Sequence, residues 1–286
     1  MQFVTLNDGN KMPILGYGVF QIQPEQTQKC VEDAISVGYR SIDTAQSYRN
    51  EAGVGAAVNS AIKGGIPRSE FFVTSKIWVS NATESGVLKS FETTMQKLGL
   101  DYLDLLLLHQ PLNDIYGAWR AMSRLKKEGR IRSIGVSNFY PDRIVDFAMN
   151  NEIKPAINQI ECNPFYQRII DCEVAKEYGV AVESWASFGE GRNDIFNNTI
   201  LKKIGANHGK SVAQVILRWL IQRNIVVIPK TTSIERMREN FSVFDFELSD
   251  DEMKTIGKMD EKKTLFGEFF NNLDAIKMMN SWKIDD

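Results

Sequence analysis

Histidine and cysteine are scarce in this 286-residue chain, which contains only His109, His208, Cys30, Cys162 and Cys172 of these two types. Their positions do not have the spacing of a metal-ligand motif, so we expect no bound metal. A small, odd number of cysteines is unlike a disulfide scaffold and is typical of a reducing compartment. The sequence therefore predicts a cytoplasmic protein with free thiols.

Long apolar runs and an excess of one charge are also missing. Apolar stretches such as Leu105–Leu108 have the length of a strand, whereas a bilayer-spanning helix needs about 20 residues. The 34 basic and 36 acidic residues are mixed along the chain and give a formal net charge of -2. The first residues contain no basic segment followed by an apolar run. We expect no nucleic-acid partner, no signal peptide and no contact with a membrane.

A repeated unit is present instead: a short apolar run, a polar residue, a loop and an amphipathic stretch. The apolar runs are Leu15–Phe20, Tyr39–Asp43, Phe71–Lys76, Leu103–His109, Ile131–Asn138, Ala156–Glu161, Val180–Trp185 and Ile225–Lys230. The amphipathic stretches include Gln26–Val37, Ser85–Leu98, Ile115–Lys127, Arg168–Tyr178 and Val212–Gln222. Strands that alternate with helices indicate a parallel sheet with crossover connections. Eight such units without a break in composition predict an α/β fold, a single (β/α)8 TIM barrel over residues 1–286.

The two ends of the chain do not follow this repeat. Residues 3–15 place an Asp8-Gly9 turn between two short apolar runs, which predicts a β-hairpin that caps the bottom of the barrel. A helix is expected over Asp250–Met259, followed by a less regular tail over residues 264–282. We therefore expect a C-terminal extension of loop and helix beyond the barrel.

Polar side chains gather at the ends of the apolar runs. Active sites of (β/α)8 barrels lie at the carboxyl ends of the strands, so these residues are candidates for one shared site. The run ends give Asp43, Lys76, His109, Ser137–Asn138, Gln159–Glu161, Trp185 and Lys230. An acid, two bases, several hydrogen-bonding groups and an aromatic ring would then face the same space.

Two apparent nucleotide-binding motifs do not fit their required context. Gly16-Tyr17-Gly18 would need a third glycine at Gln21 to match the dinucleotide fingerprint. The Gly209-Lys210-Ser211 segment follows a helical stretch rather than a strand, unlike a Walker A loop. We interpret Gly209 as a C-terminal helix glycine and Ser211 as the N-cap of the next helix.

The chain resembles the aldo-keto reductase family over nearly its whole length. The resemblance is carried by IDTAQSYRNE (42–51), FVTSKIW around Lys76, DLLLLHQP around His109, GVSNF (135–139), NQIECNP (158–164) and IPKTTSIERMRENFSVFDFELS (228–249). HQP and YGAWRA are similar to the prokaryotic-type branch of diketogluconate and methylglyoxal reductases. The resemblance implies NADPH-dependent reduction of aldehydes or ketones to alcohols, a small carbonyl substrate and a monomer.

The resemblance also implies a catalytic group of Asp43, Tyr48, Lys76 and His109, with Tyr48 as the general acid. A phenol has an ordinary pKa of about 10, and a neighbouring ammonium lowers it. We therefore expect Lys76 to bring the pKa of Tyr48 towards neutrality and Asp43 to hold Lys76. His109 is expected to donate a hydrogen bond to the substrate oxygen.

The resemblance places NADP(H) along several strand ends and one helix. The implied cofactor-binding residues are Gly18, Val19, Phe20, Asp43, Ser137, Asn138, Gln159, Trp185, Ser187, Phe188, Glu190, Lys230, Thr231, Thr232, Ser233, Arg236, Glu239 and Asn240. Ser137, Asn138 and Gln159 match the positions that hold the nicotinamide carboxamide, and Trp185 matches the ring that stacks on it. Lys230 and Arg236 match the site of the adenosine 2′-phosphate. Thr232 and Glu235 suggest a capping box at the start of that helix.

The carbonyl substrate is expected between Phe20, Tyr48, Trp78, His109 and Gln110, with Trp282 as a further apolar wall. The sequence departs from the family at Gln110, where many animal members have Trp, so this side of the pocket is expected to be more polar. SFGEG at 187–191 replaces the usual SPLG-type loop. Small aldehydes, α-dicarbonyls and sugar-derived ketones all fit.

Two other classes stay open at this point. One is a regulatory or interaction protein that binds NADP(H) on the same fold with little turnover. The other is an unrelated barrel hydrolase or lyase, against which the 228–249 segment argues. A reductase is favoured because all four catalytic residues are present.

Overall fold

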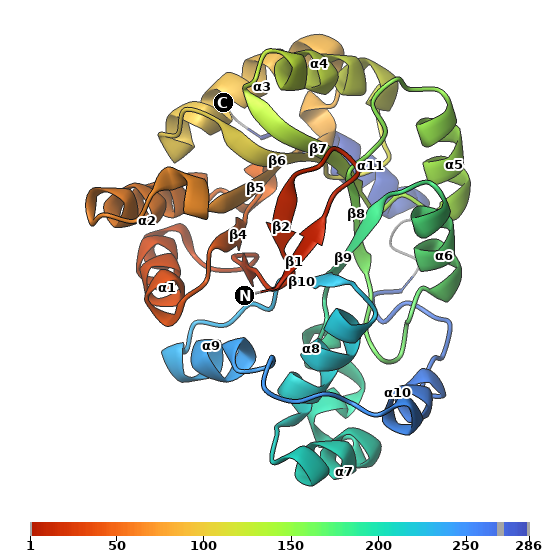
Figure 1. Cartoon of the computed structure of the whole chain (residues 1–286). Coiled ribbons are helices and arrows are strands. Elements are labelled where there is room, and N and C mark those ends of the chain that lie inside the picture. Colours follow the sequence, from red (N-terminus) through yellow and green to blue (C-terminus); the bar gives the residue numbers. More distant parts are fainter. Residues whose placement is uncertain (1, 268–271, 285–286) are drawn as a thin grey trace.

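A computed structural model describes residues 2–267 and 272–284 of the chain, and its centre is a parallel β-barrel (Figure 1). Each of the eight apolar runs coincides with a barrel strand. Most of these strands are shorter than the run because the run's ends belong to loops, and β5 extends one residue beyond its run. The strands are β1 (Phe3–Thr5), β2 (Lys11–Pro13), β3 (Tyr17–Gly18), β4 (Ser41–Asp43), β5 (Phe72–Ile77), β6 (Leu103–Leu108), β7 (Ile131–Ser137), β8 (Ile157–Glu161), β9 (Ala181–Trp185) and β10 (Val226–Val227).

The barrel strands β3 to β10 are hydrogen-bonded in sequence order, and all these pairs are parallel. A short seam joins the first strand to the last. Gly16 N donates to Val227 O at 2.8 Å, and Val227 N donates to Ile14 O at 2.9 Å. A Cβ atom on Gly18 would lie 2.8 Å from Ile228 O. The glycines of the rejected dinucleotide motif therefore allow the two ends of the sheet to approach closely.

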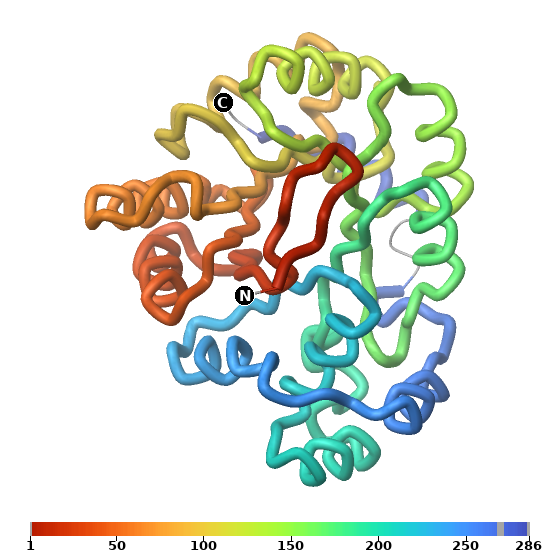
Figure 2. Tube along the Cα trace, viewed as in Figure 1, coloured from red at the N-terminus to blue at the C-terminus, as the bar shows by residue number. Residues whose placement is uncertain are grey.

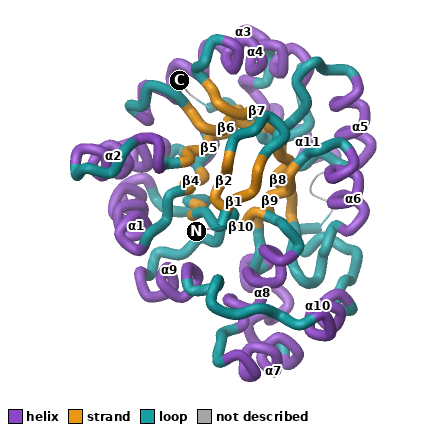
Figure 3. Tube along the Cα trace, in the orientation of Figure 1, coloured by secondary structure: helices purple, strands orange, loops and turns teal. Residues whose placement is uncertain are grey.

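Helices surround the strands on the outside of the barrel (Figure 3). They are α1 (Pro24–Val37), α2 (Glu51–Lys63), α3 (Glu84–Leu98), α4 (Ile115–Lys127), α5 (Pro141–Met149), α6 (Ile169–Glu177), α7 (Thr199–His208), α8 (Val212–Gln222), α9 (Ile234–Phe241), α10 (Asp250–Gly257) and α11 (Leu273–Ser281), with 3-10 turns η1 (Gln46–Tyr48), η2 (Arg68–Glu70), η3 (Val79–Asn81) and η4 (Gly189–Asn197). The predicted (β/α)8 fold is confirmed. Gly209 ends α7 in the left-handed conformation and Ser211 caps α8, as expected.

The N-terminal hairpin closes one end of the barrel, as predicted (Figure 2). β1 and β2 pair antiparallel, with Val4 opposite Met12. Asn7 Nδ2 donates to Pro155 O at 2.7 Å, just before β8, and Asn10 Nδ2 donates to Ser133 Oγ at 2.9 Å, near the start of β7. These contacts lie at the amino ends of the strands. The opposite end, where the candidate residues lie, is left to the loops.

The C-terminal tail is more regular than the sequence suggested. α10 fits the expected helix over Asp250–Met259, but α11 lies within the stretch that we predicted to be irregular. Asn272 caps α11 by accepting hydrogen bonds from Asp274 N and Ala275 N, a signal that was readable in the sequence. Residues 268–271 of the predicted tail, and residues 1 and 285–286 of the predicted single domain, lie outside the described residues. In the described part of the chain, the helices are too short or too polar to cross a membrane.

Candidate active site

Four polar side chains meet at the carboxyl end of the barrel. Asp43 ends β4, Lys76 lies near the end of β5, and His109 directly follows β6. Tyr48 is the last residue of η1, in the loop after β4. Because β5 pairs with both β4 and β6, its lysine lies between the residues from its two neighbours. The structure thus brings together the three strand-end residues and Tyr48, the four residues expected to be catalytic.

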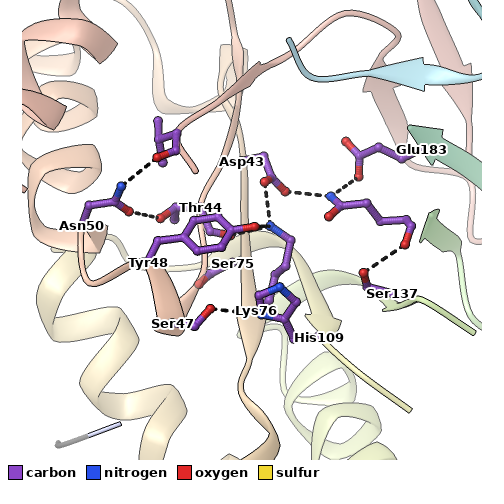
Figure 4. A network of polar contacts seen from close by, with 12 residues as sticks. Asp43, Thr44, Ser47, Tyr48, Asn50, Ser75, Lys76, His109, Ser137 and Glu183 are labelled. Atoms are coloured by element: carbon purple, nitrogen blue, oxygen red, sulfur yellow. Dashed lines mark hydrogen bonds and ion pairs between the residues drawn. The ribbon is translucent and has the colours of Figure 1, made fainter. Parts of the chain in front are cut away.

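Lys76 is the centre of this group (Figure 4). Its Nζ donates to Asp43 Oδ1 at 2.6 Å, to Thr44 O at 2.9 Å and to Tyr48 Oη at 3.2 Å. The side chain of Lys76 is fully buried. Burial disfavours the ammonium, but Asp43 and Tyr48 outweigh it and the pKa of Lys76 is raised. Lys76 is therefore a permanent cation, and the expected pair with Asp43 is present.

The phenol of Tyr48 is less acidic than the sequence suggested. Burial raises the pKa of Tyr48 above its ordinary value, and the adjacent Lys76 ammonium offsets this only in part. Our prediction of a pKa near neutrality is wrong, because the buried position removes the phenolate from water. Tyr48 consequently keeps its proton at neutral pH, next to a cation that stabilises the phenolate when the proton leaves.

His109 is a neutral imidazole. Burial and the nearby Lys76 charge hold the pKa of His109 well below its usual value. Its Nδ1 lies 3.3 Å from Ser47 Oγ, and its ring packs edge-on against Tyr48 with centroids 5.7 Å apart. Ser47 therefore fixes the ring orientation, and a neutral ring leaves one N–H for a hydrogen bond to a bound group.

Gln159, on β8, connects this group to a second buried carboxyl. Its Nε2 donates to Asp43 Oδ2 at 3.0 Å and to Glu183 Oε2 at 2.9 Å. No residue in the described ranges donates a hydrogen bond to the amide oxygen of Gln159. Burial and the Asp43 charge raise the pKa of Glu183 to about 8. Glu183 is thus largely protonated at neutral pH, and the charges of Asp43 and Lys76 balance each other.

The other expected nicotinamide residues form a connected chain of hydrogen bonds. Ser137 Oγ donates to Gln159 O at 2.9 Å, and Asn138 Nδ2 donates to His109 O at 3.2 Å. Trp185 Nε1 donates to Asn138 Oδ1 at 2.9 Å, so the indole is held in a fixed orientation beside the strand ends. These contacts bring the expected residues of β7, β8 and β9 together next to the catalytic group.

Aromatic side chains surround the catalytic group. The ring of Phe20 is 47% exposed and lies 5.0 Å from that of Tyr48. Trp78 packs against His109 at 5.2 Å and against Trp282 at 4.8 Å, and its Nε1 donates to Trp282 O at 3.0 Å. The C-terminal tail therefore completes the wall of the site. Gln110 is buried, and its Oε1 accepts no hydrogen bond in the described structure.

The end of β3 and the loop that follows it are hydrogen-bonded to residues beside the catalytic group. Val19 N donates to Asp43 O at 3.1 Å, and Gly18 N reaches Pro229 O at 3.4 Å. Asn50 Nδ2 donates to Val19 O at 3.0 Å, while Asn50 Oδ1 accepts from Thr44 Oγ1 at 2.8 Å. Gly18 and Val19, expected at the cofactor, therefore use these main-chain groups to hold the β3 and β4 loops together.

The segment after β10 offers cationic side chains. Lys230 and Arg236 are exposed, and neither forms a side-chain hydrogen bond or ion pair within the described residues. The expected capping box is wrong by one position: the N-cap of α9 is Ser233, whose Oγ accepts from Arg236 N, because Thr232 is exposed and lies outside the helix. Thr231, also expected at the cofactor, is buried just before α9, and the expected Glu239 and Asn240 are partly buried and buried in its last turn.

The 187–191 loop is held by its own contacts and by the tail. Ser187 is buried, with its Oγ 2.8 Å from Ser184 Oγ, and Phe188 packs against Phe196. Glu190 is exposed and has a positive φ of 52°. The ring of Phe266 lies 5.2 Å from that of Trp185. The tail therefore contacts the end of β9 through Phe266, and Leu265 lies beside Gly189 of the loop.

Sequence reasoning missed Glu183 and Ser47. Glu183 lies two residues before Trp185 in a buried strand and hence on the same side of it. A carboxylate at such a position is rare in proteins and was a readable signal. Ser47 has no comparable signal, because a serine in a loop after a strand is common.

Comparisons with known proteins agree with this geometry. Residues 14–261 match the sequence profile described as "Aldo/keto reductase family". The chain is 44% identical over 260 residues to the uncharacterized oxidoreductase YtbE of Bacillus subtilis. The aligned residues cover 90% of this chain and 92% of that protein. It is 41% identical over 260 residues to a glyoxal reductase of Bacillus subtilis, with the same shares covered. It is 40% identical over 265 residues to methylglyoxal reductase DkgA of Yersinia pestis, with 92% and 94% covered.

Solved structures show the same likeness. An aldo/keto reductase from Brucella melitensis is 42% identical, with a TM-score of 0.86 over 91% of this chain and 99% of that chain. A Bombyx mori aldo-keto reductase in complex with NADP is 32% identical, with a TM-score of 0.88 over 92% and 94%. The fold, the strand-end group and these relatives lead to one conclusion: the chain belongs to the aldo/keto reductase family and is an oxidoreductase.

Proposed function

We propose that this protein reduces small aldehydes and ketones to alcohols with NADPH as the cofactor, and that Tyr48 is the general acid. The observation that carries the proposal is the buried contact of 3.2 Å between Tyr48 Oη and Lys76 Nζ. A protonated phenol, a permanent cation and a neutral imidazole then face the same aromatic-walled space. This combination suits carbonyl reduction, because negative charge develops on the oxygen that receives the proton.

The residues present fit NADPH. The amide oxygen of Gln159 receives no hydrogen bond from the described residues and can accept one from a carboxamide N–H. Trp185 supplies a flat ring held by Asn138. Lys230 and Arg236 supply exposed cations close to the start of α9, where a phosphate is favoured. In this assignment Lys230 and Arg236 favour NADPH over NADH.

The chain's own groups handle the proton. When bound, the reduced nicotinamide supplies the hydride to the carbonyl carbon. Tyr48 donates its proton to the carbonyl oxygen, and Lys76 stabilises the phenolate that remains. Asp43 keeps Lys76 in place and balances its charge. We assign the proton of neutral His109 to Nε2, with Ser47 donating to Nδ1, so that Nε2–H donates to the same carbonyl oxygen and orients it.

Short aldehydes and α-dicarbonyls are the substrate class that the residues around the catalytic group support best. Phe20, Trp78 and Trp282 supply apolar surface for a small carbon chain. Gln110 adds a buried amide oxygen without a hydrogen bond in the described structure. A polar wall suits a substrate with a second oxygen, such as a dicarbonyl in its hydrated form. The names of the glyoxal and methylglyoxal reductases among the relatives agree with this class.

The test is the rate of NADPH consumption against a panel of short aldehydes and dicarbonyls, with Tyr48→Phe measured beside the unchanged protein. We expect turnover that falls by about 10²–10⁴-fold in the variant, with NADPH binding unchanged. Turnover that survives in Tyr48→Phe would show that the acid is another group. NADPH binding without any carbonyl turnover would instead favour a regulatory protein on the same fold.

A further inference from the structure

Two cysteines far apart in the sequence share one arginine on the outer side of the barrel. Arg223 follows α8, and its Nη1 lies 3.8 Å from Cys162 Sγ while its Nη2 lies 3.8 Å from Cys172 Sγ. The same Nη2 donates to Gln167 O at 2.7 Å, and the guanidinium stacks over the ring of Trp219 at 4.5 Å. The guanidinium is therefore held firmly in place, and each of its two outer nitrogens faces one sulfur.

The two thiols are also connected through Gln167. Cys162 Sγ donates to Gln167 O at 3.5 Å, the same carbonyl that accepts from Arg223 Nη2. Cys162 is fully buried directly after β8, while Cys172 lies on α6 and is partly exposed. A partly exposed cysteine and a buried one thus lie around the same guanidinium, as in protein dithiols that react in two steps.

The surroundings divide the two thiols into different roles. The neighbouring Cys162 thiol, together with the Arg223 charge, lowers the pKa of Cys172 against the effect of burial. The pKa of Cys162 is raised by the neighbouring Cys172 and by burial. Cys172 is therefore the sulfur that forms the thiolate, and it belongs to the more exposed of the two residues.

We propose that Cys162 and Cys172 form an oxidisable dithiol, a modification site for peroxides that is separate from the carbonyl-reducing group. The Cys172 thiolate attacks one oxygen of hydrogen peroxide; an S–O bond forms, the O–O bond breaks, and the released hydroxide takes a proton to become water. The Cys162 sulfur then attacks the sulfenic acid, loses its proton, and displaces a second water as the S–S bond forms. Together the two thiols lose two electrons, and one peroxide is reduced to two waters.

The dithiol is connected to the active site by hydrogen bonds of the Cys162 main chain. Cys162 N donates to Trp185 O at 3.3 Å, and Cys162 O accepts from Ser184 Oγ at 2.6 Å. A disulfide at Cys162 therefore adds a covalent link between α6 and the strand ends that carry Gln159 and Trp185. The proposal itself concerns the disulfide and does not rest on the reductase assignment.

The test uses the full-length reduced protein treated with hydrogen peroxide at neutral pH and measured by intact mass and thiol titration under denaturing conditions. We expect a mass loss of about 2 Da and a fall in titratable thiols from three to one, since the chain has three cysteines. Cys30, which is buried on α1, supplies the matched control. Cys30→Ser is expected to show the same mass loss with no thiol left.

Cys172→Ser removes the reacting sulfur at a partly exposed position and is expected to show no mass loss. Arg223→Gln keeps both thiols, and its oxidation is expected to be slower than that of the unchanged protein. A gain of about 16 Da or its multiples without disulfide formation, or a disulfide-linked dimer as the main product, would overturn the proposal. A mass loss that persists in Cys172→Ser would do the same.

Discussion

The ammonium of Lys76 lies 2.6 Å from a carboxylate oxygen of Asp43, and both side chains are buried. Breaking a buried ion pair leaves one charge without a partner, which costs about 3–5 kcal/mol. We expect Lys76→Met to lower the free energy of unfolding by this amount in urea denaturation. Besides losing activity, the variant is thus expected to unfold at a clearly lower urea concentration.

An exposed pair supplies the control. Arg120 and Glu84 are both more than half exposed, and such pairs contribute about 0–1 kcal/mol. Arg120→Met is expected to change the unfolding free energy by no more than that. The double variant Lys76→Met with Asp43→Asn should recover part of the loss, because no unpaired charge remains. If the double variant lost the sum of both single changes, the buried charge would not be the cause.

The raised pKa of Glu183 predicts that the stability of the protein depends on pH. Its pKa is raised from 4.5 in its ordinary state to about 8 by burial and by Asp43, while Gln159 and Lys76 act in the opposite direction. Between these two values the folded protein binds more protons than the unfolded chain, so stability falls as pH rises. Above about pH 8 this contribution stays constant. The slope for one group is at most about 1.4 kcal/mol per pH unit.

The measurement is urea denaturation of the unchanged protein and of Glu183→Gln at several values between pH 5 and 9. The glutamine keeps the shape of the side chain but has no proton to lose. We expect the variant to gain stability relative to the unchanged protein as pH rises, with no further gain above about pH 8. Parallel curves for the two proteins over the whole range would refute the raised pKa.

The exposed position of Arg236 predicts a preference for NADPH over NADH. If this exposed side chain binds the 2′-phosphate, Arg236→Ala removes a charged hydrogen bond worth about 1.5–3 kcal/mol. We expect the Kd for NADPH to rise by tenfold or more, on the order of that energy, while the Kd for NADH stays unchanged. Arg238→Ala lies two residues further along the same exposed helix and is the matched control. An equal rise in the Kd for NADPH in both variants would point to a general effect of positive charge.

Trp282 predicts a role for the tail in substrate binding. Its edge-on contact with Trp78, at 4.8 Å between ring centroids, is worth about 0.5–1.5 kcal/mol. Trp282→Ala is expected to raise KM for aldehydes by roughly 2- to 13-fold, the range given by that energy. The Kd for NADPH should stay unchanged, because the ring and main-chain contacts of Trp282 are with Trp78, which is not one of the proposed cofactor residues. A rise in the Kd for NADPH alone would contradict this separation of roles.

The barrel could be predicted because each strand coincides with an apolar run, and most of these runs end in a polar residue. Helix α2 was missed for a physical reason. Gly53 and Gly55 weaken its helical pattern, yet a Cβ atom on Gly55 would lie only 2.2 Å from Leu98 O. The glycine is required by the close approach of α3, which the sequence does not show. Packing between helices overrides local propensity at this point.

The candidate site was predictable in its membership but less so in its electrostatics. Asp43, Lys76 and His109 follow from the strand-end rule alone. The direction of the Tyr48 pKa did not follow, because it depends on how deeply the phenol is buried. The Arg223 dithiol could not be foreseen either, since Cys162 follows β8, Cys172 lies on α6 and Arg223 follows α8, and only the tertiary structure brings them together.

The seam between β3 and β10 has a consequence for how the chain is made. Leu15 is synthesised early and Val227 late, and the two form a bridge that closes the barrel. While the ribosome is still adding the residues between them, β3 and the newest strand have open edges, which are prone to pair with other chains. Trp282 is added later still. The barrel therefore closes, and the wall beside His109 is completed, only near the end of translation.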